Sequence, residues 1–171
     1  MGVDMVVVIM GSKSDWVIMK QCTKVLHQFG IPFETYISSA HRTPLRTKEI
    51  VLDTEHRGAN VFIGAAGMAA HLAGSIAAMT NKPVIAVPLA GGVLDGIDSL
   101  LSSVQMPNGI PVATMAVGKA GAINAAYFCV QILSLQPKYS NLCLELAKDR
   151  EKRAIQLEKD TQTIQDELQS Q

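Results

Sequence analysis

The chain has 171 residues, of which 48% are hydrophobic and 18% charged, and its formal net charge is zero. This composition excludes a disordered chain, predicts one globular domain with a sizeable core, and argues against a nucleic-acid binder. No signal-peptide pattern opens the sequence, and the uncharged stretch 58–81 is too rich in glycine and alanine to suggest a membrane span. Three cysteines without a CxxC pair favour reduced thiols packed in helices of a cytoplasmic protein.

Five hydrophobic, β-type runs alternate with helical patterns along the chain. We expect strands at 5–10, 33–38, 61–65, 84–87 and 112–117, and helices at about 12–29, 43–58, 69–79, 97–105, 119–135 and 139–168. Repeated β-α units predict an α/β fold in a single domain, a three-layer sandwich around a parallel sheet. Residues 1–137 would form the core of this domain, and residues 138–171 a long C-terminal helical extension.

Charge is unevenly distributed along the sequence. Residues 61–118 carry only three formal charges, on Lys82, Asp95 and Asp98. So long an uncharged segment in a small domain predicts that much of it faces another subunit, and we therefore expect a homo-oligomer. The tail from Glu145 onward is rich in charge, and its few aliphatic residues fit one narrow helical stripe. That stripe would pack on its own subunit or on a neighbour.

Three polar clusters follow the first three expected strands: GSKSD at 11–15, SSAHRTP at 38–44 and AAGMAAHL at 65–72. An open parallel sheet binds its ligands outside the carboxyl ends of its strands, so these clusters should meet in one crevice. They supply hydroxyls, a carboxylate, a guanidinium and two imidazoles. We interpret this set as an active site for a phosphorylated small molecule.

The first cluster has two readings. Ser12, Ser14 and Asp15 could simply cap a helix, or the hydroxyls and exposed N–H groups could cradle an anion. Asp15 would repel a phosphate and is better suited to ribose hydroxyls. The segment matches neither GxxxxGK[ST] nor GxGxxG, so neither a nucleoside triphosphate nor a dinucleotide is indicated.

Histidine and arginine carry the chemistry of the other two clusters. Arg42 offers a bidentate fork for phosphate, and the adjacent His41 can move protons near neutral pH. His71 is either a half-buried structural histidine or part of a wall that a flat ligand can approach closely. His27 and His56 lie within expected helices and should be structural. We find no HExxH motif, close Cys/His cluster or GxSxG elbow, so we expect neither a metal site nor a serine hydrolase.

The ordered segments GSKSDW, SAHRTP, AAHLAG, GIDSL and SVQMPNGIPVATMAVGKAGAINAA closely resemble the N5-carboxyaminoimidazole ribonucleotide mutase family of purine biosynthesis, over about residues 6–135. The resemblance implies a flavodoxin-like α/β subunit assembled as an octamer, without metal or organic cofactor. It implies an isomerase that moves a carboxylate from the exocyclic nitrogen to ring carbon C4 through enclosed CO2. An ATP-dependent synthetase would supply the substrate.

The resemblance also implies roles for individual residues. It makes His41 the catalytic acid/base and places His71 beside the imidazole and carboxylate as a second catalytic residue. The substrate-binding residues that it implies are Ser12, Ser14, Asp15, Ser39, Ala40, Arg42, Gly67, Ala70 and Leu72. The chain departs from the family at Met68, where glycine is usual, at Ala73, where proline is usual, and at Asp95, where a small polar residue is common. Met68 would either narrow the pocket or reshape a subunit contact.

Two alternatives to the mutase stay open. A sister class of the family carboxylates aminoimidazole ribonucleotide directly with CO2, although AAHL at 69–72 looks like the mutase version of that loop. A non-catalytic nucleotide-binding module on the same fold would use His41 and Arg42 equally well, because fold does not fix function. Consumption of each substrate discriminates among the three.

Overall fold

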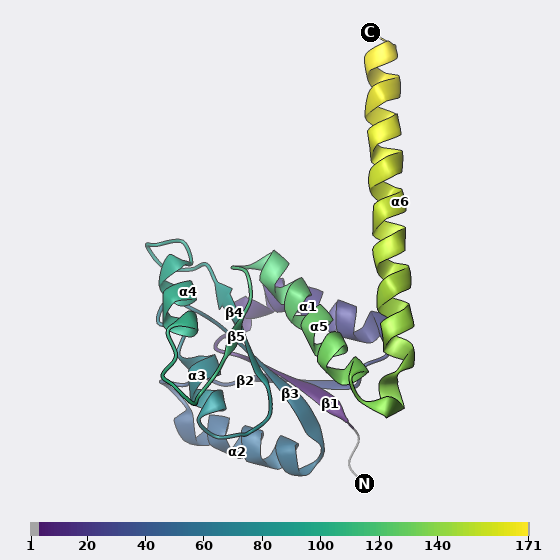
Figure 1. Ribbon diagram of the computed structural model, residues 1–171. Coiled ribbons are helices and arrows are strands. Elements are labelled where there is room, and N and C mark those ends of the chain that lie inside the picture. Colours follow the sequence, from purple (N-terminus) through teal and green to yellow (C-terminus); the bar gives the residue numbers. More distant parts are fainter. Residues whose placement is uncertain (1–3, 171) are drawn as a thin grey trace. The chain divides into compact units, whose positions relative to one another are not determined.

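The computed structural model, which describes residues 4–170, contains a five-stranded parallel sheet (Figure 1). The strands pair in the order β2-β1-β3-β4-β5, so the first strand lies between the second and third. Their bounds are Met5–Met10 for β1, Phe33–Ile37 for β2, Ala59–Gly67 for β3, Val84–Leu89 for β4 and Ala113–Thr114 for β5. This is the flavodoxin-like doubly wound order, and the expected α/β class is confirmed.

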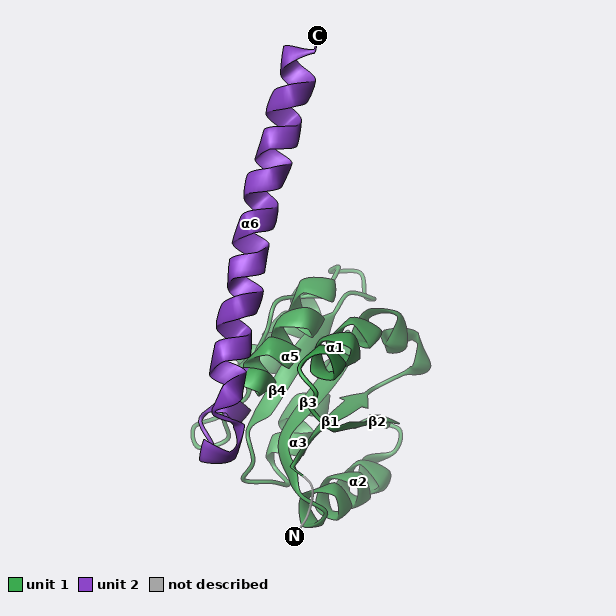
Figure 2. Cartoon of the chain, turned by 90° about the vertical axis from the view of Figure 1, so that its right-hand side faces the viewer, with its two compact units in different colours: residues 1–130 green, residues 131–171 purple. Residues whose placement is uncertain are grey.

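Helices cover both faces of this sheet. Helices α1 and α5 lie on one side, and α2 and α3 on the other, which makes three layers (Figures 1 and 2). The bounds are Trp16–Gln28 for α1, Pro44–His56 for α2, Leu72–Ala77 for α3, Ile97–Val104 for α4 and Lys119–Ser134 for α5. Single 3-10 turns occupy Lys13–Asp15 and Pro137–Tyr139.

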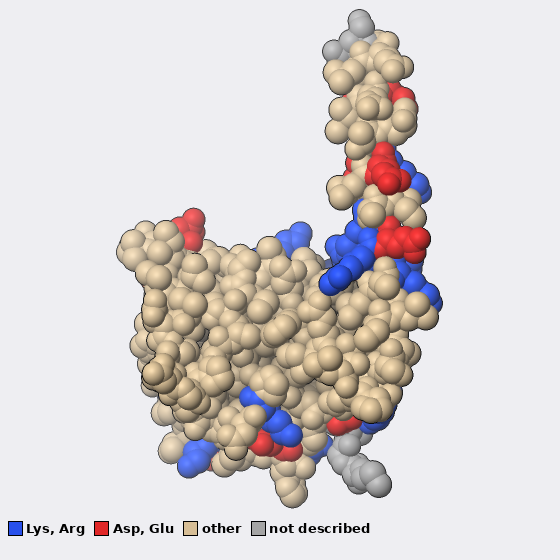
Figure 3. All heavy atoms as spheres, in the orientation of Figure 1, with Lys and Arg blue, Asp and Glu red and all other residues tan. Residues whose placement is uncertain are grey.

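The chain divides into two compact units, residues 1–130 and 131–171 (Figure 2). The second unit contains helix α6, Asn141–Gln169, so the expected long C-terminal helix is confirmed. Every residue from 151 to 170 is exposed, and Lys, Arg, Asp and Glu side chains are prominent along this helix (Figure 3). None of the described helices is both long and apolar enough to cross a membrane.

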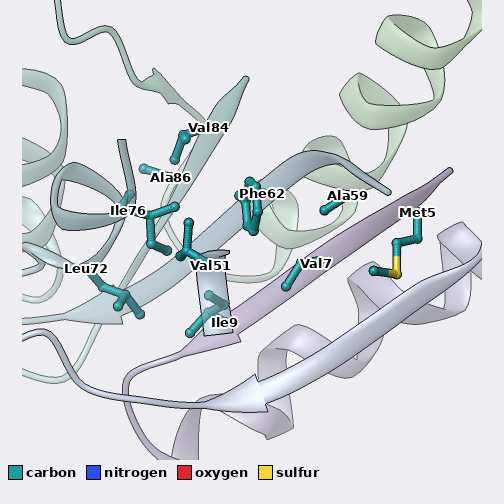
Figure 4. Packing of buried hydrophobic residues seen from close by; sticks show 11 residues of the cluster. Met5, Val7, Ile9, Val51, Ala59, Phe62, Leu72, Ile76, Val84 and Ala86 are labelled. Atoms are coloured by element: carbon teal, nitrogen blue, oxygen red, sulfur yellow. The ribbon is translucent and has the colours of Figure 1, made fainter. Parts of the chain in front are cut away.

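The core lies on both faces of the sheet, with one cluster facing the layer that holds α2 and α3 and buried residues of α1 and α5 on the other side. Strands β1 and β4 are buried along their whole length, as expected for parallel strands covered on both faces. Burial of this apolar surface is the main favourable contribution to folding. Figure 4 shows the cluster, which includes Met5, Val7, Ile9, Val51, Ala59, Phe62, Leu72, Ile76, Val84 and Ala86.

Several elements differ in length from the expectation; strand β4, for example, ends at Leu89 rather than at 87, and α1 starts at Trp16 rather than at about 12. Strand β3 is longer, because Ala66 and Gly67 continue to pair with Pro88 and Leu89 of β4. Helix α3 starts at Leu72 rather than at 69, and the loop before it is bonded to α4 instead. Strand β5 has two residues where we expected six. The extensions of β3 and β4 and the late start of α3 lie next to the carboxyl ends of the strands, where tertiary contacts override local pattern.

The cysteines are only partly as expected. Cys22 and Cys129 are free thiols buried in helices, but Cys143 is exposed, so the expectation of a packed thiol is wrong there. Burial raises the pKa of the Cys22 thiol to about 12. This thiol is therefore un-ionised and behaves as a small apolar side chain.

Candidate active site

A cleft of about 620 Å³ opens where the loops after β1, β2, β3 and β4 come together. The three polar clusters meet in it, as the parallel topology predicts. All the predicted site residues except Ala70 line this cleft: Ser12, Ser14, Asp15, Ser39, Ala40, His41, Arg42, Gly67, His71 and Leu72. Ala70 is buried, and its N–H donates to Ser102 Oγ at 2.9 Å.

The first wall is a helix cap that also borders the cleft. Asp15 accepts a hydrogen bond from the Ser12 N–H at 2.9 Å, and Ser12 Oγ accepts one from the Ser14 N–H at 3.4 Å. These reciprocal bonds form a capping box before α1. The capping and ligand-binding readings therefore coexist, because the residues that fix the helix start also line the cleft.

Burial shifts the titration of the Asp15 carboxyl. Desolvation raises its pKa above the ordinary value, against the opposing effects of hydrogen bonds from Ser12 and Ser14 and of the Arg42 charge. Asp15 has two oxygens, and both remain able to accept further hydrogen bonds. The hydrogen bond from Ser12 holds the Asp15 carboxyl in the cleft wall, where its oxygens can accept hydrogen bonds from sugar hydroxyls.

The second wall is the loop between β2 and α2, which a set of hydroxyl groups holds in place. Ser38 Oγ lies 2.8 Å from Thr47 Oγ1, and both residues are buried. Thr43 Oγ1 accepts from the Ser39 N–H at 2.9 Å, and the Ser39 hydroxyl accepts from the Arg42 N–H at 3.2 Å. These hydroxyl contacts therefore fix the backbone of the loop that carries His41 and Arg42.

Arg42 ties the second loop to the first. Its Nη2 donates to the carbonyl oxygen of Gly11 at 2.7 Å. Within the described part of the chain, this is the one hydrogen bond that the guanidinium makes, although it has five N–H donors. The side chain is exposed and lines the cleft, so donors remain for an anion.

The most informative contact in the cleft joins the two histidines. His41 Nε2 lies 2.9 Å from His71 Nδ1, and the ring planes meet edge to face at 77°. One ring donates the hydrogen bond and the other accepts it, so each ring orients the other. Residues 30 positions apart thus form a pair able to give and take a proton at one point of the cleft.

The third wall is the loop between β3 and α3. Here Ser102 of α4 accepts the Ala70 N–H, and its hydroxyl lies 3.4 Å from the Met68 carbonyl oxygen. These contacts fix the backbone before His71, which stands at the start of α3. Among residues 4–170, no group of three His, Cys, Asp or Glu side chains is placed to hold a metal ion.

Sequence reasoning missed part of this arrangement. The cleft is also lined by Gly11, Ala66, Met68, Ala69, Ala90 and Gly91. Ala90 and Gly91 follow β4, and the same rule that singled out the first three strand ends could have included this fourth one. The supporting hydroxyls of Thr47 and Ser102 carried no signal, because a serine or threonine in a helix is common.

A doubly wound sheet with a pair of contacting histidines and an exposed arginine at its strand ends belongs to the α/β class that binds small molecules at this edge. Within that class, the chain belongs to the AIR carboxylase family, whose model matches residues 5–154. The resemblance noted in the sequence is thereby confirmed.

Individual relatives agree with this membership. An N5-carboxyaminoimidazole ribonucleotide mutase from Pseudomonas aeruginosa is 51% identical over 77% of this chain and 82% of its own length. One from Saccharolobus solfataricus is 49% identical over 84% of this chain and 88% of its own length. The crystal structure of PurE from Treponema denticola superimposes with a TM-score of 0.78 at 27% identity, over 90% of this chain and 95% of that one.

Proposed function

We propose that this protein is an N5-carboxyaminoimidazole ribonucleotide mutase, an isomerase of purine biosynthesis that acts without metal or organic cofactor. The observation that carries the proposal is the contact between His41 and His71 inside a cleft that also presents Arg42 and Asp15. Relatives of about 50% identity bear the same name and match most of the chain.

The reaction needs two proton transfers, one to the exocyclic nitrogen and one from ring carbon C4. When the bond between the exocyclic nitrogen and the carboxylate breaks, CO2 leaves, its bonding electrons stay on nitrogen, and nitrogen takes up a proton. Ring carbon C4 then attacks CO2 and afterwards loses its own proton, which restores the aromatic ring. A single imidazole can deliver the first proton and accept the second, and His41 is the group that we assign to both transfers. His71 orients the His41 ring through their hydrogen bond.

The rest of the nucleotide fits the remaining walls. Arg42 binds the phosphate with its remaining donors, assisted by the hydroxyls of Ser12, Ser14 and Ser39. Asp15 accepts hydrogen bonds from the ribose. Small or apolar residues of the cleft, Ala40, Gly67 and Leu72, surround the flat imidazole, and Ala70 contributes indirectly by holding the loop that carries His71.

One assay separates the candidate functions. The purified chain is given N5-carboxyaminoimidazole ribonucleotide, and formation of the 4-carboxy product is followed by its absorbance, because the two isomers have the same mass. Conversion at a rate well above that of an enzyme-free blank supports the mutase. If neither substrate is converted, the result supports a non-catalytic nucleotide-binding module instead. The family model is described as AIR carboxylase, which favours a second candidate, direct carboxylation. Turnover of aminoimidazole ribonucleotide with low bicarbonate, but not of the carboxyamino compound, would establish that activity instead.

We further propose that the chain assembles as a homo-octamer in the cytoplasm, where an ATP-dependent synthetase supplies its substrate. An apolar surface on α4 and the loop before it supports assembly: Val93, Leu94, Ile97, Leu101 and Val104 are all exposed. Figure 3 shows few charged side chains over the region of α3 and α4. Light scattering tests the proposal, because Leu101→Arg should yield smaller particles than the wild type. A wild-type monomer at micromolar concentration would contradict it.

A further inference from the structure

The loop that leads to His71 is held to the protein interior through Ala70. Met68 and Ala69 of this loop are exposed, whereas Ala70 is 3% exposed. The buried Ala70 N–H donates to Ser102 Oγ at 2.9 Å, so its acceptor comes from α4, 32 positions further along the chain. Ser102 itself does not line the cleft. A residue outside the cleft thus bonds the loop that carries one of the two histidines.

The backbone around Ala70 forms a tight turn that leads directly into α3. The His71 N–H donates to the Ala69 carbonyl oxygen at 2.9 Å, which closes a three-residue turn centred on Ala70. The His71 carbonyl oxygen then accepts the Ser75 N–H at 2.9 Å, a bond of the first turn of α3. Both backbone groups of His71 are therefore bonded, and the position of the turn determines where its side chain starts.

The Ser102 hydroxyl is itself held in place by α4. The shortest bond that its proton can make is to the Asp98 carbonyl oxygen, at 2.8 Å and one helical turn back, and its oxygen then accepts the Ala70 N–H. Helix α4 is in turn bonded to the sheet, because the buried Ser99 hydroxyl donates to the carbonyl oxygen of Leu89 at the end of β4, at 2.9 Å. A continuous series of hydrogen bonds thus connects β4 to the turn before His71.

The contact between the two imidazoles is sensitive to where this turn lies. His71 contributes Nδ1, the ring nitrogen nearest to its backbone, and that atom lies 2.9 Å from His41 Nε2. A separation of about 3.6 Å is no longer a hydrogen bond, so a backbone shift of less than about 1 Å removes the contact. Without an acceptor at position 102, the Ala70 N–H would be buried and unpaired, which is unfavourable, and the turn should move outward to bond water.

We infer that Ser102 is a positioning residue for the acid–base pair, an inference that rests on the proposed function. Through the Ala70 N–H it sets the turn from which the His71 side chain projects, and His71 orients His41. Catalysis depends on such placement, because a shift of about 1 Å caused by a distant substitution can lower the rate by about 10²-fold. Since Ser102 acts from outside the cleft, it should affect turnover more than nucleotide binding.

The test removes the hydroxyl and measures turnover, binding and geometry. Ser102→Ala should lower kcat by about tenfold or more. The Kd of the 4-carboxy product, measured by calorimetry, should change by less than about threefold, because Arg42 and Asp15 are bonded to other loops. Crystal structures of wild type and variant should show the separation of the two ring nitrogens increased beyond about 3.5 Å in the variant.

Ser103→Ala is the matched control. Ser103 is the next residue of α4 and is buried, and its hydroxyl donates at 2.7 Å to the Ser99 carbonyl oxygen of the same helix rather than to the loop. This variant should keep the wild-type kcat and the contact of the histidines, whatever its Tm. Ser102→Thr keeps a hydroxyl that can make the same helical bond and should restore most of the turnover. It also keeps the inference testable if Ser102→Ala folds poorly.

A double variant decides whether Ser102 acts through His71. In His71→Gln the pair is already lost, so adding Ser102→Ala should lower kcat by less than about twofold further. A further fall as large as the one that Ser102→Ala causes in the wild-type background would mean that Ser102 acts by another route, and the inference would fail.

The other outcomes separate this inference from the proposed function. If Ser102→Ala and Ser103→Ala have the same kcat, or if the two imidazoles stay in contact in Ser102→Ala, Ser102 supports the fold alone and the inference is wrong, while the mutase activity stands. If wild type converts no substrate, the proposed function fails, and the crystal structures still decide whether Ser102 places His71 beside His41.

Discussion

Two groups of ionisable side chains, one on β2 and around α2 and the other in the cleft, are built in opposite ways. The edge cluster consists of Glu34, Tyr36, Asp53 and Arg57; the cleft cluster consists of Asp15, His41, Arg42 and His71. In the edge cluster, Arg57 donates to both Glu34 oxygens, to Asp53 at 2.9 Å and to the Tyr36 hydroxyl at 3.2 Å. The guanidinium of Arg57 thus has three side-chain partners within the cluster. In the cleft cluster, Arg42 donates from a single nitrogen, to a backbone carbonyl.

The titration shifts follow this difference. Hydrogen bonds from Arg57 and then Tyr36 hold the pKa of Glu34 near 2, because they stabilise its charged form. Asp15 shifts the other way, because burial raises its pKa by more than its hydrogen bonds lower it. In the edge cluster the N–H donors of the arginine are bonded to side chains of the same cluster, which contributes to stability. In the cleft cluster, N–H donors of Arg42 and the proton shared by the two histidines stay available for a ligand. Substitutions in the two clusters should therefore separate activity from stability.

The largest expected effect is on turnover, from a change in the cleft cluster. His41→Asn keeps size and polarity but removes proton transfer, so kcat should fall by about 10²–10⁴-fold. Binding of the nucleotide should stay within about tenfold, as measured by calorimetry with product. A variant that retains more than about a tenth of wild-type turnover would remove His41 from the acid–base role.

Arg42→Lys should act mainly on binding. Lysine lacks the planar fork that can donate to Gly11 and to a phosphate together, so nucleotide binding should weaken by about 1.5–3 kcal/mol. The loss should largely vanish for the dephosphorylated nucleoside, measured by the same calorimetry. Equal losses for nucleotide and nucleoside would place the phosphate elsewhere.

A change beneath the cleft should affect both properties. Thr47→Val removes a buried hydroxyl that contacts Ser38 at 2.8 Å, and the free energy of unfolding should drop by about 1–2 kcal/mol. Because the same hydroxyl network fixes the loop of His41, turnover should fall too. Urea denaturation and the mutase assay measure the two effects. Thr35→Val, at an exposed position of β2, is the control and should change stability by less than about 0.5 kcal/mol.

Much of this framework is predictable from sequence, for a physical reason. Continuous apolar runs such as that of β1 define buried parallel strands, and parallel topology then brings their trailing loops together. The order of elements alone therefore predicts that His41, Arg42 and His71 share one cleft, and they do. The rule is robust because it depends on the order of elements rather than on the exact ends of each one.

Details that depend on tertiary contact were not predictable. The bond between His41 and His71 requires two loops to lie at one specific separation, which no local pattern encodes. The late start of α3 depends on the Ser102 hydroxyl, which accepts a hydrogen bond from the Ala70 N–H. The two residues are 32 positions apart in the sequence, so no local pattern reveals the contact. The left-handed backbone at Met68 contradicts local preference, so sequence could mark the residue as unusual but not give its conformation.

The smallest expected effect comes from the edge cluster and touches stability alone. Glu34→Gln keeps the shape of the side chain but removes the charge that Arg57 binds. The free energy of unfolding at pH 7 should therefore fall by about 0.5–1 kcal/mol. This is the size expected for a partly exposed ion pair, because the Glu34 side chain is 34% exposed. The folded pKa of Glu34 lies near 2, below its ordinary 4.5, so the stabilisation is present above about pH 4.5 and is lost as pH falls toward 2. Urea denaturation across this range should show wild type and variant converging at low pH, while mutase turnover at pH 7 stays unchanged. Glu49→Gln, at an exposed position of α2, should show no such convergence. A gap between wild type and Glu34→Gln that persists unchanged at pH 2 would mean that the charge of Glu34 is not what stabilises this edge.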